Sequence, residues 1–166
     1  MKIGFHNSIE EISKNEWNSL LNDINYPFLK HEFLQLLENT NCVGAKTGWI
    51  PLHISVSKDN SLLAAMPLYL KSHSQGEFVF DHSWANAFYQ HGLDYYPKLV
   101  SSIPHTPASG PRFLIKEGEN KKELFEMIKE GVKNIAAKNN ISSWHILFPM
   151  EEEVDFYDDS NLSIRK

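Results

Sequence analysis

The stretch IPLHISVSKDNSLLAAMPLYL, residues 50–70, decides the fold class. Apolar residues alternate with polar ones at Leu52, Ile54 and Val56, which is the period of a strand with one buried face. The turn-forming residues 58–61 follow, and a second apolar run extends to Leu70. The pattern predicts an antiparallel hairpin. Pro67 has no backbone N–H, so the second arm needs a bulge or an unpaired edge there.

Helical and strand patterns flank this hairpin on both sides. A strand at residues 3–5 and two short helices are predicted before it. Capping boxes at Ser8/Glu11 and Ser13/Glu16 precede the first helix, and a break at residues 26–27 precedes the second. After it we expect the following elements in order: a strand through 78–80, a helix over 81–90, strands at 99–103 and 113–115, a long helix capped by Asn120, and a strand at 144–148. The period of the last strand places the side chains of His145 and Trp144 on opposite faces of the sheet. This order predicts an α/β fold with a mixed sheet.

Composition narrows the function classes. The 166 residues fit one domain, and 16 Lys and Arg against 21 Asp and Glu give a net charge of −5. That charge opposes attraction to phosphate backbones, so we expect no nucleic-acid partner. No apolar run has the length of a signal peptide or of a membrane span, which needs about 18 residues, so we expect no membrane span and a cytoplasmic location. The single Cys42 is expected to be a packed side chain.

Familiar catalytic and cofactor motifs are missing from the sequence. His73, His82 and His91 recur every nine residues, a spacing that suits neither a helical nor a strand metal site, so no metal is expected. The sequence contains no serine nucleophile elbow, Walker A loop or dinucleotide fingerprint. The residues alone therefore name no reaction.

The segment from Tyr95 to Arg112 is the first candidate site. It carries four prolines and one glycine, which stiffen the backbone, together with phenol, imidazole, hydroxyl, ammonium and guanidinium groups. A stiff loop with these groups suits recognition of a small-molecule or peptide-like ligand. A rigid crossover whose tyrosines only pack is an equally good interpretation of the same residues.

A second cluster lies at the end of the strand predicted through residues 78–80. Glu77 and Asp81 are the carboxylates best placed for general-base chemistry, although surface carboxylates usually interact only with water. Trp84 follows them, and burial preferences favour a core position over a ligand stack by about two to one.

The same stretches resemble the FemAB-like family of GNAT-type acyltransferases, described as peptidoglycan biosynthesis or recognition proteins. The resemblance runs in register from about residue 2 to residue 166. It is carried by residues 44–53, 67–74, 76–81 with 83–85, 95–99, and 104–107 with 110–112.

The resemblance implies a GNAT-like (acyl-CoA N-acyltransferase) fold with a mixed, mostly antiparallel, splayed sheet flanked by helices. Full-length members carry two such halves, so residues 1–166 are expected to be a single N-terminal domain truncated before a second, similar half. In GNAT enzymes a glycine-rich strand-to-helix turn holds the pyrophosphate of the acyl-thioester. The corresponding turn here, Gly118-Glu119-Asn120, has one glycine and acidic neighbours. We therefore expect acyl-CoA as a co-substrate of the full-length protein and not as a firmly bound cofactor of this half.

Three functions stay open from the sequence. The first is acyl or aminoacyl transfer to an amine, with a proton acceptor and substrate-positioning residues in the two clusters. The proton-acceptor candidates are Glu77, Asp81 and His105, and the substrate-binding candidates are Trp84, Tyr95, Tyr96, Lys98, Thr106 and Arg112. The second is recognition of cell-wall fragments without chemistry. The third is a silent pseudo-domain that packs against a second acyltransferase half or against itself.

Overall fold

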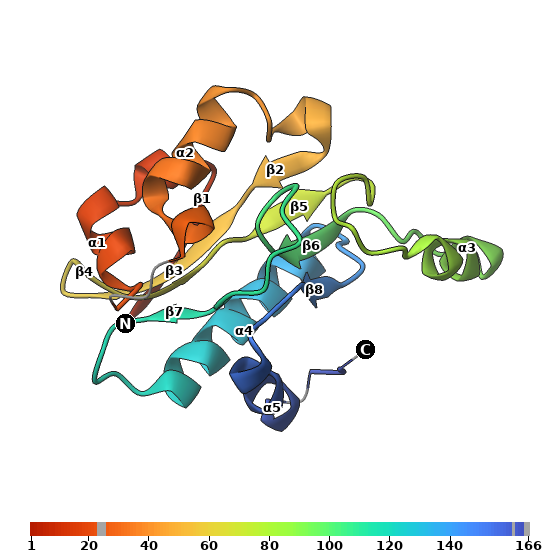
Figure 1. The fold of residues 1–166 in the computed structure, drawn as a ribbon. Helices are drawn as coiled ribbons and strands as arrows, with labels where there is room; N and C mark the ends of the chain where they lie inside the picture. The colour runs from red at the N-terminus through yellow and green to blue at the C-terminus, as the bar shows by residue number, and fades with distance from the viewer. Residues whose placement is uncertain (23–25, 161, 165–166) are drawn as a thin grey trace.

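The computed structural model describes residues 1–22, 26–160 and 162–164, and their strands form two four-stranded sheets (Figure 1). The first sheet has the order β1 (Lys2–His6), β3 (His53–Lys58), β4 (Ser61–Met66), β7 (Leu114–Ile115), with all neighbours antiparallel. The second has the order β2 (Trp49–Pro51), β5 (Tyr69–Lys71), β6 (Lys98–Ser101), β8 (Trp144–Ile146). Only its β6–β8 pair is parallel. The predicted mixed, mostly antiparallel arrangement is confirmed.

The hairpin of residues 50–70 passes through both sheets and confirms the prediction made from its sequence. Asp59 and Asn60 form its two-residue turn with φ of 50° and 63°, the conformation that matches the twist of paired strands. Both arms are interrupted at the same level, at Leu52 and at Pro67-Leu68, where Leu52 N donates to Leu68 O at 2.9 Å. Pro67 therefore ends β4, and the hairpin leaves the first sheet for the second.

Helices cover the sheets (Figure 1). The helical elements are the 3-10 turns Ile9–Glu11, Pro27–Leu29 and Ala45–Thr47, and the helices α1 (Lys14–Ser19), α2 (His31–Asn39), α3 (His82–Gln90), α4 (Lys121–Lys138) and α5 (Glu151–Asp159). The predicted caps at Ser13 and Asn120 are present, because their side chains accept from the backbone N–H groups of Glu16 and Glu123. The reciprocal capping boxes are not formed: Ser8 Oγ accepts from Glu10 N instead of Glu11 N, and the Glu16 carboxylate accepts from Leu62 N. Among the described residues, no helix is long and apolar enough to cross a membrane.

The main core lies between α4 and the sheets. Phe125 and Ile128 of α4 are fully buried in one cluster with Ile54 and Leu99, and each such side chain contributes about 1.5–3 kcal/mol by leaving water. Gly131 lets the helix approach closely, since a Cβ there would lie 3.1 Å from the Ile3 side chain. A second cluster packs α1 and α2 against the first sheet.

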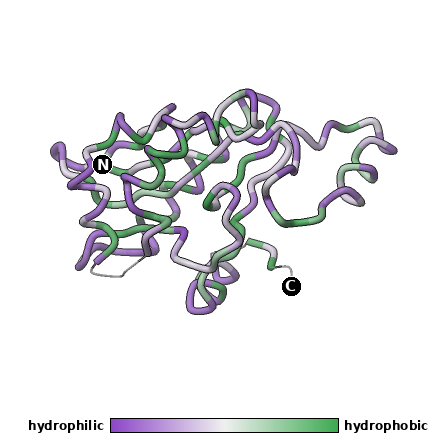
Figure 2. Tube along the Cα trace, turned by 45° about the horizontal axis from the view of Figure 1, so that its top comes forward, coloured by the Kyte–Doolittle hydropathy of each residue, from purple (hydrophilic) through white to green (hydrophobic). Residues whose placement is uncertain are grey.

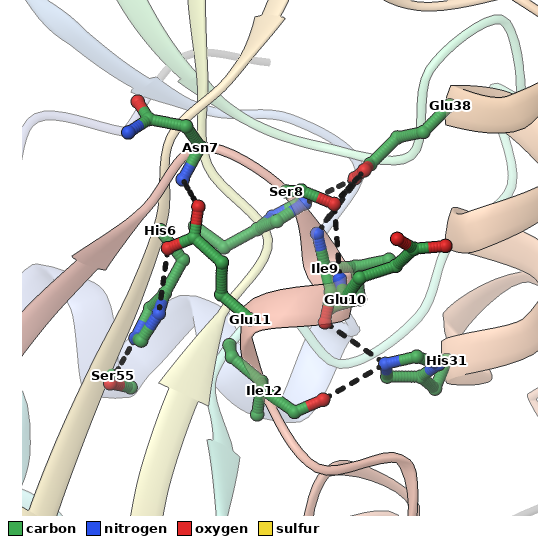
Figure 3. A network of polar contacts seen from close by, with 11 residues as sticks. His6, Asn7, Ser8, Ile9, Glu10, Glu11, Ile12, His31, Glu38 and Ser55 are labelled. Carbon is green, nitrogen blue, oxygen red and sulfur yellow. Dashed lines mark hydrogen bonds and ion pairs between the residues drawn. The ribbon is translucent and has the colours of Figure 1, made fainter.

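Glu38 of α2 ties the N-terminal segment to the helices (Figure 3). Its carboxylate accepts from Ser8 Oγ at 2.6 Å and from Ile9 N at 3.0 Å, and it lies 3.2 Å from His53 Nε2. His53 Nδ1 accepts from Leu68 N, so Nε2 carries the proton that reaches Glu38. Burial opposes charge on Glu38, but the hydrogen bonds from His53 and Ser8 outweigh it and lower the pKa of the carboxyl group.

Two expectations were wrong. Residues 78–80 form no strand: Phe78 has φ of 59°, and Phe78 and Phe80 point into solvent with 57% and 89% of their surfaces exposed. The carboxylates on either side, Glu77 and Asp81, turn inward instead. Cys42 is exposed and not packed, because it lies in the loop after α2, where its carbonyl oxygen lies 3.1 Å from His105 Nε2.

Candidate functional site

One face of the second sheet carries a row of three buried polar or aromatic side chains. Trp49 of β2 lies opposite Lys71 of β5, and Lys71 lies opposite Lys98 of β6. All three are fully buried. Leu99 points to the other face, toward α4, as strand alternation requires. Two lysines thus lie side by side beneath the surface, a placement that is costly unless carboxylates neutralise them.

The two carboxylates come from the segment between β5 and α3. Lys98 Nζ lies 2.7 Å from Glu77 Oε2 and 2.5 Å from Asp81 Oδ2. The Tyr95 hydroxyl donates to Asp81 at 2.9 Å, and the Tyr96 hydroxyl lies 3.4 Å from the other Asp81 oxygen. Five of the residues that the sequence singles out therefore meet in one place, which we call the Lys98 cluster: Glu77, Asp81, Tyr95, Tyr96 and Lys98.

The two carboxylates of the Lys98 cluster are held differently. Burial opposes charge on Asp81, but hydrogen bonds from Lys98 and Tyr95 outweigh it and lower the pKa of Asp81. Burial raises the pKa of Glu77, and Lys98 offsets that only in part. Glu77 Oε1 is buried and has no hydrogen-bond partner among the described residues. Asp81 is thus a fixed counter-ion, whereas Glu77 keeps one oxygen unused.

Lys71 was not among the site residues expected from the sequence, although it lies in one of the stretches that carry the resemblance, residues 67–74. Its ammonium donates to Gln75 O at 3.0 Å and lies 3.8 Å from the centre of the Trp49 ring. Burial lowers the pKa of Lys71 to about 8. The available signal was the hairpin register, which sets Lys71 opposite Trp49. The position beside Lys98 depends instead on how β6 pairs with β5, which the hairpin does not reveal.

His105 and Thr106 lie on the loop that follows β6. The Thr106 hydroxyl donates to Pro104 O at 3.1 Å. His105 is exposed, with its Nε2 3.1 Å from Cys42 O and its ring 5.7 Å from that of Trp49. Because a carbonyl oxygen only accepts, Nε2 must carry the proton, and Nδ1 of the neutral ring is then free to accept one.

Arg112 is placed apart from the Lys98 cluster. Its guanidinium is fully buried and donates to backbone carbonyls, with distances of 2.8 Å to Leu147 O, 3.0 Å to Gly110 O and 2.6 Å to Ala108 O. Burial lowers its pKa to about 10. In this conformation Arg112 organises the loop before β7. The structure here resembles the rigid crossover that was one of the two interpretations of residues 95–112.

Trp84 lies on α3, which stands away from the two sheets in both views (Figures 1 and 2). It is 45% exposed, so the core position favoured by burial preferences was wrong. Other large exposed side chains lie on the same part of the chain: Phe78, Phe80, Tyr89 and Leu93. Trp84 is therefore on the surface next to the Lys98 cluster and not inside it.

The turn from β7 into α4 contains the single glycine that the sequence analysis noted. Gly118 has φ of 83°, and Asn120 caps the helix. Glu117 lines an open depression of about 710 Å³ together with Asn18, Ser19 and Asn22. This surface carries one carboxylate and no cation among those lining residues. Within the described part of the chain, no group of three or more His, Cys, Asp or Glu side chains is arranged to hold a metal ion.

The structure of this chain is similar to solved structures of acetyltransferases. An aminoglycoside 6'-N-acetyltransferase from Acinetobacter haemolyticus has a TM-score of 0.56 at 10% identity, covering 100% of this chain and 92% of that one. A ribosomal-protein-alanine N-acetyltransferase from Brucella melitensis biovar Abortus 2308 has a TM-score of 0.58 at 10% identity, covering 100% and 93%. A glucosamine-6-phosphate N-acetyltransferase from Arabidopsis thaliana has a TM-score of 0.53 at 8% identity, covering 100% of this chain and 95% of that one. The chain has the GNAT-type acyltransferase fold.

No curated protein sequence matches the chain. The profile of the FemAB-like family, described as peptidoglycan biosynthesis/recognition, matches residues 8–166. The match spans the whole second sheet, the strands β3, β4 and β7 of the first sheet, and every helix from α1 to α5. It therefore includes the Lys98 cluster, Lys71 and the His105 loop. The chain therefore belongs to the FemAB-like family.

Proposed function

We propose that this domain transfers an acyl group to an amine, and that the face of the second sheet bearing Lys71 and Lys98 is its acceptor side. The observation that carries the proposal is the Lys98 cluster beside Lys71, within an acyltransferase fold. Four buried ionisable side chains at one end of β5 and β6 are costly to hold in a fold. Such clusters concentrate at functional sites.

The roles follow from the geometry. His105 is the best proton acceptor of the three candidates, because its Nδ1 is available while Lys98 engages both Glu77 and Asp81. In the reaction the amine nitrogen forms a bond to the thioester carbon and the carbon–sulfur bond breaks. The amine proton passes to His105, and the protonated imidazole then returns a proton to the departing thiolate, directly or through water.

Further parts of this proposal concern the substrates. Tyr96, Thr106 and Trp84 are partly or largely accessible and would contact the acceptor, whereas Lys98, Tyr95 and Arg112 would hold the surrounding backbone. Acyl-CoA is the proposed co-substrate. The family description supports an acceptor related to peptidoglycan.

A thiol-release assay with acetyl-CoA and a panel of amines tests the proposal. His105→Ala is expected to slow release about 100-fold, the usual lower range for loss of a general base. His91→Ala removes an exposed imidazole from the end of α3 and should leave the rate unchanged. Calorimetry with acetyl-CoA completes the test: no heat and no thiol release with any amine would reject thioester-dependent transfer.

The second candidate is recognition without chemistry, which includes the pseudo-domain hypothesis. It is favoured by one observation: Glu77 and Asp81 are buried and both bind Lys98 inside the protein, so neither carboxylate faces solvent as a base. Saturation-transfer NMR with muropeptides separates the candidates. Contact of the ligand with the His105 loop in the absence of any thiol release supports recognition alone.

A further inference from the structure

The indole N–H of Trp49 has no hydrogen-bond acceptor among the described residues, although the side chain is fully buried. Two other tryptophans show the usual solution: Trp17 Nε1 donates to Leu29 O at 2.8 Å, and Trp144 Nε1 donates to Ser101 Oγ at 3.0 Å. A buried donor without an acceptor costs about 1–3 kcal/mol. The Trp49 N–H is therefore a position where an acceptor from outside the chain would be stabilised.

A positive charge lies next to this donor. Lys71 Nζ is 3.8 Å from the centre of the Trp49 ring, and its hydrogen bond to Gln75 O uses one of its three N–H groups. No carboxylate oxygen of the described residues lies within 4.0 Å of Lys71 Nζ, in contrast to Lys98, which has two such partners. Trp49 and Lys71 together offer hydrogen-bond donors and a positive charge, and no anionic side chain of the described residues pairs with that charge.

Gly76 and His105 border the unpartnered N–H. A Cβ on Gly76 would lie 3.0 Å from Trp49 Nε1 and 2.6 Å from His105 Nδ1, so both ring nitrogens lie close to this glycine. The φ of +79° at Gly76 disfavours any side chain at that position. His105 is exposed, and rotation of its side chain away from Trp49 would open a path from solvent to the N–H.

We propose that Trp49 Nε1 and Lys71 Nζ form a subsite for a carboxylate group, which enters when the His105 ring rotates outward. A carboxylate is planar and offers two acceptor oxygens, so it can take one hydrogen bond from each donor. A phosphate dianion fits less well, because Lys71 supplies a single positive charge, and the Lys98 ammonium nearby is already paired with Glu77 and Asp81. The subsite concerns binding alone and does not depend on acyl transfer.

Burial lowers the pKa of Lys71 to about 8, which agrees with an ammonium that lacks its counter-ion. A bound carboxylate favours the charged form and would raise that pKa. Acetate should consequently bind more weakly as the pH rises through 8. This pH dependence is distinct from that of a site made only of neutral donors.

Proton–nitrogen NMR of the tryptophan indole groups tests the subsite. Titration with sodium acetate, at ionic strength held constant with sodium chloride, should move the Trp49 resonance saturably with millimolar affinity. The Trp17 and Trp144 resonances, whose N–H groups already have acceptors, serve as internal controls and should not move. Acetamide, which has the same shape without the charge, should bind at least tenfold more weakly.

Two variants sharpen the result. Lys71→Met should weaken acetate binding at least tenfold, whereas Lys14→Met, which removes an exposed ammonium paired with Glu32, should not change it. Because Lys71 is buried and its variant could unfold, His105→Ala provides a second test at an exposed side chain. It should preserve or strengthen acetate binding by removing the ring that covers the N–H.

Three outcomes would overturn the proposal. The first is a Trp49 resonance that acetate does not move. The second is equal movement with inorganic phosphate, which would mean that any anion suffices. The third is a Trp49 resonance that follows the titration of His105 and shifts in the acetate-free His105→Ala protein, which would identify His105 Nδ1 as the acceptor. A failure of thiol release with a saturable Trp49 shift would reject the transfer reaction and leave the subsite intact.

Discussion

Lys71 and Lys98 lie directly opposite each other on β5 and β6, with both side chains fully removed from solvent. Like charges in this position destabilise a pair of strands. The sheet tolerates them because Glu77 and Asp81 reach the same place from the following loop. The stability of this end of the sheet therefore depends on electrostatics as well as on packing.

Replacing Lys98 should be strongly destabilising. Lys98→Met leaves Glu77 and Asp81 buried without their cation and should lower the free energy of unfolding by about 3–5 kcal/mol. Urea denaturation measures this. Lys14→Met, at an exposed ion pair with Glu32, should change it by less than about 1 kcal/mol. In a double-mutant cycle, Glu77→Gln should cost less in the Lys98→Met background than in the wild type; strictly additive losses would contradict the cluster.

Lys71 predicts a rise of stability at alkaline pH. Its pKa falls from 10.5 in the unfolded chain to about 8 in the folded one, so between these values the unfolded state binds more protons. The free energy of unfolding should then increase with pH across that window, by about 3 kcal/mol at most. The control is Lys71→Met. Contributions from the other titrating groups cancel in the difference between the stability curves of the wild type and this variant. If the free energy of unfolding changes with pH equally in the wild type and in Lys71→Met above pH 8, the pKa of Lys71 is not shifted by folding.

Glu38 should act as a clamp between α2 and the N-terminal segment. Glu38→Ala removes the acceptor for Ser8 Oγ, Ile9 N and His53 Nε2, and should cost about 2–3 kcal/mol. Chemical denaturation measures the loss. Glu126→Ala, which removes an exposed partner of Lys129, should be nearly neutral. Hydrogen exchange adds a local readout: unchanged protection of the Ile9 amide in Glu38→Ala would contradict the role.

The effect of replacing Phe78 should depend on whether the new residue tolerates a left-handed backbone. Its φ of 59° is costly for a bulky residue, and its side chain is 57% exposed. Phe78→Asn suits this conformation and should raise the free energy of unfolding by about 0.5–1 kcal/mol. Phe78→Val, with a β-branched side chain at the same position, should lower it by about 1 kcal/mol. Thermal denaturation decides, and equal stability of the two variants would show that the backbone relaxes freely.

The sequence was sufficient for the parts of the fold that depend on local chemistry. The hairpin turn at Asp59-Asn60, the interruption at Pro67 and the cap at Asn120 each follow from the residue's own conformational preference. Residues 78–80 were wrongly predicted as a strand, since the alternation of Phe78 and Phe80 imitates a strand with a buried face. Their direction was decided instead by Glu77 and Asp81, whose partner Lys98 is distant along the chain.

The candidate site was predictable in composition more than in arrangement. Glu77, Asp81, Tyr95 and Lys98 were each identified, and they do meet. Lys71 was missed because nothing local distinguishes it from a surface lysine at the end of a strand. The exposure of Trp84 was missed for a related reason: burial preference describes an average tryptophan, whereas this one lies on a helix with a single buried residue, Ala85.

Asp81 connects two parts of the molecule that otherwise share little. It is the residue immediately before α3, and its carboxylate is held by Lys98 and Tyr95. Phe88 adds one ring contact with Tyr95, at 5.2 Å between centroids. The orientation of α3 is thus fixed mainly at its N-terminal end, by the Asp81 carboxylate. The surface that carries the exposed aromatic residues of α3 is therefore tied to the interior through a buried ion pair.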